Sequence, residues 1–269
     1  MSFRRVILTH GGAGVDAIHA NGTLVAAQLG MELMVNGQSA LDASVRAVRC
    51  LEDDPRFNAG TGSRFRADGQ TVEMDASCMV SDGAFGAVAG VEGICNPIDI
   101  AHAVMLHSPH ILIVGNGASQ FAREHNVPLR MIGNADKREN GADNQKPACD
   151  TVGAVAFDGE SFAAALSSGG VSGSAIGRVG DVPLPGCGLY CGPAGAVACT
   201  GDGEFIALKI LAREVYGWLE QQMPPADAVR NALALFEDGV DIGLIVSTSS
   251  GYAADATAGM PWSYLTESR

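Results

Sequence analysis

The sequence predicts an α/β (α+β) fold in which sheets pack face to face and helices cover the outside, built as a single domain over residues 1–269. Helical and strand-like patterns occur in both halves of the chain, without the strict alternation typical of a parallel sheet. A chain of 269 residues can bury one substantial core. The composition, 47% apolar and 17% charged, is typical of a compact globule and not of a disordered chain.

The first half begins with a short buried strand, expected at residues 5–9. Apolar residues then recur at helical spacing, which predicts an amphipathic helix over residues 39–51. Pro55 prevents this helix from continuing. The remaining elements expected here are strands at 70–74 and 84–91, a helix at 96–107 and a buried strand at 110–114.

The second half follows a polar segment, residues 133–149, which we interpret as a solvated linker because it contains almost no apolar residues. Apolar strands are expected directly after it. One long helix is predicted over residues 203–222, and another begins at Pro224, since proline is favoured in a first helical turn. The expected elements, in order, are strands at 151–157, 161–166 and 196–199, helices at 203–222 and 224–236, and strands at 242–247 and near Tyr252.

Charge and composition argue against several classes of partner. The formal net charge is −13 and no cluster of lysine and arginine is present, so we expect no nucleic-acid partner. No segment approaches the ~20 apolar residues that cross a bilayer, and the start lacks a signal-like apolar run, so we expect no membrane partner and a cytoplasmic location. The six histidines and seven cysteines show no metal-ligand spacing, which favours reduced thiols and no cofactor.

The junction between Asp150 and Thr151 carries the main chemical signal, because a polar linker stops there at a threonine that begins a buried strand. A threonine hydroxyl needs a base within hydrogen-bond reach, and an N-terminal threonine carries one in its own α-amino group. Cleavage of the Asp150–Thr151 bond would therefore create nucleophile and base on one residue. Taken alone, the junction is more typical of a loop that ends where a strand begins with a β-branched residue.

Two further segments could supply the rest of a site. The turn at residues 177–181 places Arg178 near Asp181, a pairing suited to the carboxylate and ammonium groups of an aspartyl substrate. Thr200 and Gly201 lie between a strand and a helix, where a hydroxyl and a backbone N–H can stabilise an oxyanion. Taken singly, these are also typical of a surface salt bridge and an ordinary N-cap turn.

Together these segments resemble the N-terminal-nucleophile hydrolases of the plant-type L-asparaginase and isoaspartyl peptidase family. The matching motifs occur in the family's order over nearly the whole chain: His10-Gly-Gly-Ala-Gly14, Leu51-Glu-Asp-Asp-Pro-Arg-Phe-Asn-Ala-Gly-Thr-Gly62, Met74-Asp-Ala-Ser77, Gly86-Ala-Val-Ala-Gly90, Asn96-Pro97, Asp150-Thr-Val-Gly-Ala-Val155, Ser167-Ser-Gly-Gly170, Gly177-Arg-Val-Gly-Asp181 and Thr200-Gly201. The resemblance implies a four-layer αββα sandwich, autocleavage into residues 1–150 and 151–269, and a homodimer of the cleaved units.

The resemblance also implies a role for each matching residue. Its substrate would be L-asparagine or a β-aspartyl (isoaspartyl) dipeptide. The implied assignments are Thr151 as nucleophile and base, Ser168 beside it, Arg178 and Asp181 as substrate-binding groups, Thr200 and Gly201 as the oxyanion hole, Asn58 approaching from the first half, and a possible structural sodium ion on the backbone carbonyls of Leu51, Glu52, Asp54, Phe57, Ala59 and Thr61.

The chain departs from the family's usual asparaginases at two positions, which keeps alternatives open. Asp150 stands where those enzymes have glycine, as in glycosylasparaginases and taspases, and Ser168 stands where they have threonine. Asp181, which taspases lack, favours a substrate with a free α-amino group. The alternatives are a glycosylasparaginase-type amidase and a homologue that is neither processed nor catalytic.

Overall fold

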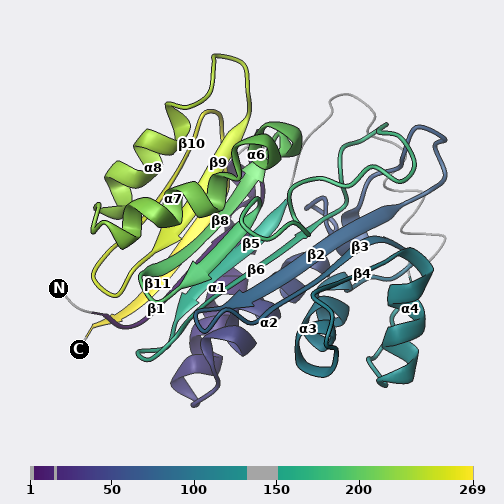
Figure 1. Ribbon diagram of the computed structural model, residues 1–269, viewed down its shortest axis with the longest axis horizontal. Helices are drawn as coiled ribbons and strands as arrows, with labels where there is room; N and C mark the ends of the chain where they lie inside the picture. Colours follow the sequence, from purple (N-terminus) through teal and green to yellow (C-terminus); the bar gives the residue numbers. More distant parts are fainter. Residues whose placement is uncertain (1–2, 15–16, 132–150, 269) are drawn as a thin grey trace.

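Two sheets packed face to face form the centre of the molecule, and helices cover both outer faces (Figure 1). The computed structural model describes residues 3–14, 17–131 and 151–268. The expected linker, residues 133–149, and Asp150 therefore lie outside the described residues. The six cysteines in the described part of the chain are free thiols.

The larger sheet has seven strands in the order β11-β1-β5-β6-β2-β3-β4. Neighbouring strands in this sheet are antiparallel, except that β3 and β4 are parallel. The strands span Phe3–His10 (β1), Glu73–Val80 (β2), Phe85–Glu92 (β3), Leu112–Val114 (β4), Val152–Phe157 (β5), Phe162–Ser168 (β6) and Trp262–Ser268 (β11).

The smaller sheet has four antiparallel strands in the order β10-β9-β8-β7. These strands span Leu189–Gly192 (β7), Gly195–Gly201 (β8), Ile242–Ser247 (β9) and Tyr252–Ala256 (β10). All four come from the second half of the chain, so the second half contributes to both sheets while the first half contributes only to the larger one.

The helices form two separate layers. Below the larger sheet in Figure 1 lie Ala20–Val35 (α1), Ala40–Glu52 (α2), Pro97–His107 (α3) and Gly115–Glu124 (α4). Over the smaller sheet lie Gly203–Lys209 (α6), Leu211–Glu220 (α7) and Pro225–Leu233 (α8). Short 3-10 turns occur at Ala17–His19 (η1) and Gly60–Gly62 (η2). Among the described residues, none of the helices is both long and apolar enough to cross a bilayer.

Alternating side chains along each strand belong to different apolar layers. In β1, Ile7 packs with the first helical layer, whereas Val6 and Leu8 pack between the sheets. In β8, Ala198 faces the larger sheet and Cys199 faces the second helical layer. Because successive strand side chains point to opposite faces, three apolar layers separate four layers of structure. The predicted αββα sandwich is confirmed.

Several elements differ from the sequence prediction. The long helix expected over 203–222 is two helices, because Ile210 adopts a left-handed conformation with φ of 48° between α6 and α7. The strand expected at 70–74 begins at Glu73 and runs to Val80. The strand expected at 110–114 is shorter and not buried, since Val114 is exposed. Four elements were not predicted: α1, α4, β7 and β11.

Candidate active site

Thr151, Ser168 and Asp75 lie side by side on the three central strands of the larger sheet, β5, β6 and β2, with Thr151 directly before β5. Val152 pairs with Ser167, which brings the preceding Thr151 next to Ser168. Ser168 in turn is the register partner of Asp75 on β2. All three side chains are at least nine-tenths buried. Since Val152 faces the first helical layer, alternation directs Thr151 into the space between the sheets.

The smaller sheet brings Thr200 and Gly201 to the same place from the opposite side. Thr200 is the second-last residue of β8, and its hydroxyl donates to the Thr151 carbonyl at 3.4 Å. The same hydroxyl accepts the backbone N–H of Ala13 at 3.2 Å. The glycine-rich turn after β1 therefore contacts the residue expected in the oxyanion hole.

Arg178 does not pair with Asp181, its neighbour in the sequence motif. Its Nε donates to Glu204 Oε1 at 2.8 Å and its Nη2 donates to Oε2 at 2.7 Å. Asp181 is instead fully enclosed, and its carboxyl lies close to Gly188 and Gly203, where a Cβ atom would come within 2.9 Å and 2.7 Å of its two oxygens. Only residues without a side chain leave room for this carboxyl.

One pocket joins most of the expected site residues. Thr151, Ser168, Arg178, Asp181 and Gly201 all line it, together with Asp75, Gly170, Val171, Gly180 and Val182. Its free volume of ≈ 10 Å³ leaves room for about one water molecule. Thr200 and Asn58 are not among the lining residues and lie behind the pocket wall.

Burial controls the charge of the two pocket carboxyls. Removal from water raises the pKa of Asp181 to about 7, against the opposing effect of Arg178. Burial also raises the pKa of Asp75, although that carboxylate accepts backbone N–H groups from Gly90 at 2.9 Å and Gly180 at 3.4 Å. The hydrogen bonds from Arg178 lower the pKa of the more exposed Glu204.

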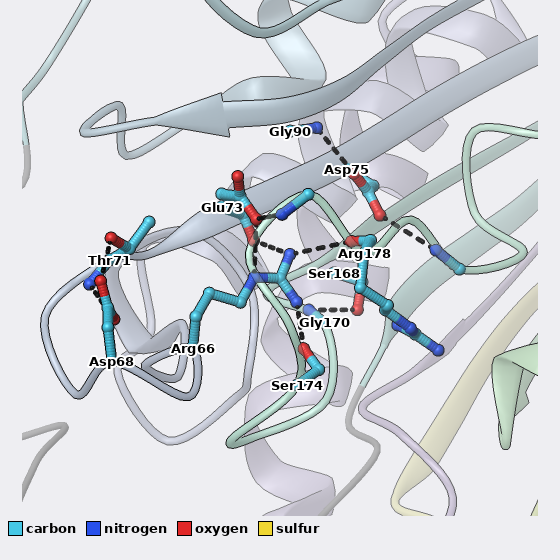
Figure 2. Close-up of polar contacts among 12 residues, drawn as sticks. Arg66, Asp68, Thr71, Glu73, Asp75, Gly90, Ser168, Gly170, Ser174 and Arg178 are labelled. Atoms are coloured by element: carbon cyan, nitrogen blue, oxygen red, sulfur yellow. Dashed lines mark hydrogen bonds and ion pairs between the residues drawn. The ribbon is translucent and has the colours of Figure 1, made fainter.

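Asn58 fixes the turn that follows Ser168. Its side-chain amide donates to the Gly170 carbonyl at 2.7 Å, and its backbone carbonyl accepts the N–H of Gly169 at 2.8 Å. The Ser168 hydroxyl accepts the N–H of Gly170 at 3.0 Å, as Figure 2 shows. Asn58 thus approaches the site from the first half of the chain and contacts the turn, with Ser168 between that turn and Thr151.

His10 is a buried neutral neighbour of Thr151. It ends β1 opposite Gly153, and burial lowers its pKa to about 3, with only the nearby Thr151 backbone opposing this. Neither ring nitrogen has a hydrogen-bond partner among the described residues. A neutral imidazole at this position cannot act as the cationic partner of a carboxylate near neutral pH.

The loop proposed for sodium offers neutral oxygen ligands. Hard cations prefer such oxygens. A carbonyl that accepts one amide keeps a second lone pair. The carbonyls that accept an amide within the loop are those of Leu51, Asp54, Phe57 and Ala59. In the described part of the chain, no group of three or more His, Cys, Asp or Glu side chains could hold a metal ion.

Four charged residues of the site were not identified from sequence. Asp75 lies within a motif that was noted, but nothing in its local sequence shows that it lines a pocket. Glu204, Arg66 and Glu73 contact the segment around Arg178, yet they lie 26 or more residues from it in the chain. Only the folded topology brings these residues together.

Comparisons with known proteins identify the family of the chain. The sequence model of a family described as asparaginase matches residues 5–131 and 129–269. An isoaspartyl peptidase/L-asparaginase of Homo sapiens is 39% identical, covering 96% of this chain and 91% of the human protein. A protein of the same name from Danio rerio is 39% identical over 88% of this chain and 83% of its own length. A plant-type L-asparaginase of Pyrococcus furiosus is 36% identical over 97% of this chain and 96% of its own length. The resemblance seen in the motifs is confirmed, and the chain belongs to the asparaginase family.

Proposed function

We propose that this protein hydrolyses the side-chain amide of L-asparagine and the isoaspartyl bond of β-aspartyl dipeptides, with Thr151 as the nucleophile. The relatives from Homo sapiens and Danio rerio carry both activities in their names, and the relative from Pyrococcus furiosus carries the asparaginase activity in its name, in agreement with the sequence prediction. The observation that carries the proposal is the pocket in which the first residue before β5 meets Arg178 and Asp181. A hydroxyl nucleophile, a cation and a buried carboxyl around one cavity match an aspartyl substrate.

Activation would proceed by cleavage of the bond between Asp150 and Thr151. The Thr151 hydroxyl attacks the Asp150 carbonyl carbon, the C–N bond breaks, and the hydroxyl oxygen is left esterified while the amine is freed. Water then hydrolyses the ester. The products are residues 1–150 and residues 151–269, the second of which begins with a free α-amino group. That amine has an ordinary pKa of roughly 7.7–8.0, suited to a general base near neutral pH.

In the mature enzyme the same hydroxyl would attack the substrate amide. Arg178 grips the α-carboxylate, Asp181 accepts from the α-ammonium group, and Thr200 with Gly201 stabilises the oxyanion. The α-amino group of Thr151 takes the hydroxyl proton and delivers it to the departing ammonia or amino acid. Water then hydrolyses the aspartyl ester and restores the hydroxyl. Ser168 lies beside Thr151 and holds its side chain.

Three further properties are proposed from the family resemblance. A sodium ion would be held by the carbonyls of the Leu51–Thr61 loop, where it would brace the segment that carries Asn58. Two cleaved units would assemble as a homodimer. The enzyme would act in the cytoplasm.

The nucleophile is tested with Thr151→Ala. We expect this variant to stay as one chain of 27.6 kDa and to release no ammonia from asparagine, whereas the parental protein gives two fragments, the second with Thr151 at its N-terminus. Intact mass and N-terminal sequencing measure cleavage, and an ammonia assay measures turnover. Ammonia release by Thr151→Ala at the parental rate would exclude Thr151 as nucleophile, and a parental chain that stays intact would favour the unprocessed alternative.

Asp150 favours one competing substrate, a glycosylated asparagine. Parallel assays on asparagine, β-aspartyl-leucine and aspartyl-glucosamine separate the two hypotheses. We expect the first two to be hydrolysed and the third to be a poor substrate. Preference for aspartyl-glucosamine would replace the proposal with the glycosylasparaginase alternative.

A further inference from the structure

We propose that Arg66 is a positioning residue that holds the substrate-gripping segment, defined here as residues 170–181, in a fixed position relative to Thr151. The inference rests on the proposed function in one respect, namely that Arg178 binds the substrate carboxylate. It adds that the position of Arg178 is set by a buried ion pair between Arg66 and Glu73, two residues of the first half of the chain.

Arg66 is an arginine with no exposed side-chain surface, and its guanidinium contacts the segment directly. Nη1 donates to the Ser174 hydroxyl at 2.7 Å, and Nη2 donates to the Arg178 carbonyl at 3.3 Å and to the Glu73 carbonyl at 2.8 Å. Figure 2 shows the guanidinium between these groups. The planar guanidinium of Arg66 therefore links residues 174 and 178 to β2. The ammonium group of a lysine cannot provide this geometry.

Glu73 completes the attachment. Its carboxylate pairs with Arg66 Nε at 3.1 Å and also accepts the backbone N–H of Gly177 at 2.7 Å. A buried arginine is costly unless it is paired, and here its counter-ion contacts the same segment. The pair thus fixes residues 174, 177 and 178, the turn that leads into the proposed carboxylate-binding side chain.

Backbone contacts bring the two segments together near the ion pair. Gly173 donates to the Phe65 carbonyl at 2.9 Å, and Ala67 donates to the Ser174 carbonyl at 2.9 Å. Arg66 lies between these two bonds, so its own position is well defined. The turn of residues 173–178 is consequently held along one side by residues 65–67 and 73.

Arg66 also reaches the opposite end of the segment, next to the nucleophile. Gly170 has a φ of +73°, and a Cβ atom there would lie 2.3 Å from Arg66 Nη1. Gly170 is the residue whose N–H is accepted by Ser168 and whose carbonyl accepts from Asn58. One side chain therefore contacts the segment both beside Ser168 and at Arg178. Loss of its fork should disturb substrate binding more than the chemical step.

The test compares Arg66→Lys with Ser174→Ala and the control Arg64→Lys, all in the full chain. The lysine keeps the charge but not the fork, and Ser174→Ala removes one contact without disturbing a buried charge. Arg64 is a half-buried arginine two residues away. The readouts are amide hydrogen exchange of residues 171–181, with β5 and β8 as internal references, and separate values of KM and kcat for asparagine.

We expect Arg66→Lys to speed exchange in residues 171–181 by about tenfold and to raise KM by about tenfold, with kcat within about threefold of the parental value. Ser174→Ala should shift both in the same direction by about threefold, and Arg64→Lys should change neither. Unchanged exchange at 171–181, or an equal rise in β5 and β8, would overturn the positioning role. An unchanged KM in an active enzyme would overturn it as well.

The parental enzyme and Arg178→Ala separate this inference from the proposed function. If the parental protein does not hydrolyse asparagine, the proposed function fails and the exchange pattern alone decides on Arg66. If Arg178→Ala keeps the parental KM, Arg178 does not bind the substrate carboxylate. Faster exchange at 171–181 in Arg66→Lys would still show that Arg66 holds this segment in place.

Discussion

Arg178, which lines the pocket, and Glu204 form a bidentate ion pair with hydrogen bonds of 2.8 Å and 2.7 Å. A bidentate carboxylate on an arginine is the geometry that a substrate carboxylate would adopt. Under the proposed function, Glu204 therefore occupies the place of the substrate carboxylate on Arg178. The Glu204 side chain is 62% exposed, so the pair is worth at most about 1 kcal/mol and can open when a substrate enters.

Glu204→Gln should tighten substrate binding. Without the competing carboxylate, Arg178 is free to meet the substrate, and we expect KM for asparagine to fall by about threefold with kcat unchanged, consistent with an exposed pair of at most ~1 kcal/mol. Steady-state kinetics at low ionic strength measure this. Glu214→Gln, an exposed neighbour on α7, is the charge-matched control and should leave KM unchanged. A rise in KM for Glu204→Gln would show that Glu204 orients Arg178 and does not compete for it.

The raised pKa of Asp181 predicts a pH dependence of substrate capture. Asp181 must be ionised to accept from an ammonium group, and its pKa of about 7 applies to the substrate-free protein. The Thr151 amine proposed as general base has an ordinary pKa of roughly 7.7–8.0, so its protonation should lower both kcat and kcat/KM as pH falls. A bound ammonium favours the charged carboxylate, so Asp181 should titrate only in the kcat/KM profile, and we expect kcat/KM to fall about tenfold more than kcat between pH 8 and pH 6. Equal falls in the two profiles would assign the titration to another group.

Asp181→Asn should stabilise the fold at alkaline pH while abolishing activity. The folded-state pKa is raised, so the native protein binds more protons than the unfolded chain, and stability is lost as pH rises through about 7. A rise from 3.8 to about 7 corresponds to roughly 4 kcal/mol at most. Urea unfolding should therefore give equal stabilities for parent and variant below pH 4 and a more stable variant at pH 8. A variant less stable than the parent at pH 8 contradicts this reasoning.

The elements predicted correctly are those with strong local signals. Helix α2 has Ser39 as its N-cap in a capping box with Asp42, followed by apolar residues at helical spacing. Helix α3 has Pro97 in its first turn. Such signals act within a few residues of the chain and do not depend on tertiary contacts, so sequence analysis can place these helices almost to the residue.

The missed elements lack such signals. Helix α1 buries the small residues Gly22, Ala26, Ala27 and Gly30, but its apolar residues Leu24 and Val25 are exposed, so no single apolar stripe marks its inner face. The break between α6 and α7 is invisible for a different reason. Ile210 is a β-branched residue in a left-handed conformation, a position normally marked by glycine. Packing, and not local preference, determines both features.

The candidate site shows the same division. Thr151, Arg178 and Asp181 were proposed from short motifs, and the structure brings them to one pocket. Arg178 and Asp181 were expected to face a substrate together, and both line the pocket, but the ion-pair partner of Arg178 in the folded chain is Glu204, which lies 26 residues away. Asp75 enters the site only through the register of β2 with β6. Contacts between distant strands and helices cannot be inferred from spacing within one segment.

The tight contact between Gly153 and His10 predicts that no side chain is tolerated two residues after Thr151, the proposed nucleophile. A Cβ at position 153 would lie 2.2 Å from His10 Nε2 and 2.5 Å from Leu166 Cδ2. Gly153→Ala should therefore destabilise the fold by about 3 kcal/mol. It should also slow the proposed self-cleavage, because β5 must shift and displace Thr151, the residue directly before it. Urea unfolding and intact mass over time measure the two effects.

His10→Ala makes this prediction specific. If the imidazole is the main obstacle, the double variant should recover about 1–2 kcal/mol relative to the sum of the single variants. Gly117→Ala is the matched control, since its Cβ would meet nothing closer than 3.5 Å in α4, and it should stabilise the protein by about 0.5–1 kcal/mol. Additive effects of His10→Ala and Gly153→Ala would instead assign the conflict to Leu166, which lies opposite Gly153 on β6.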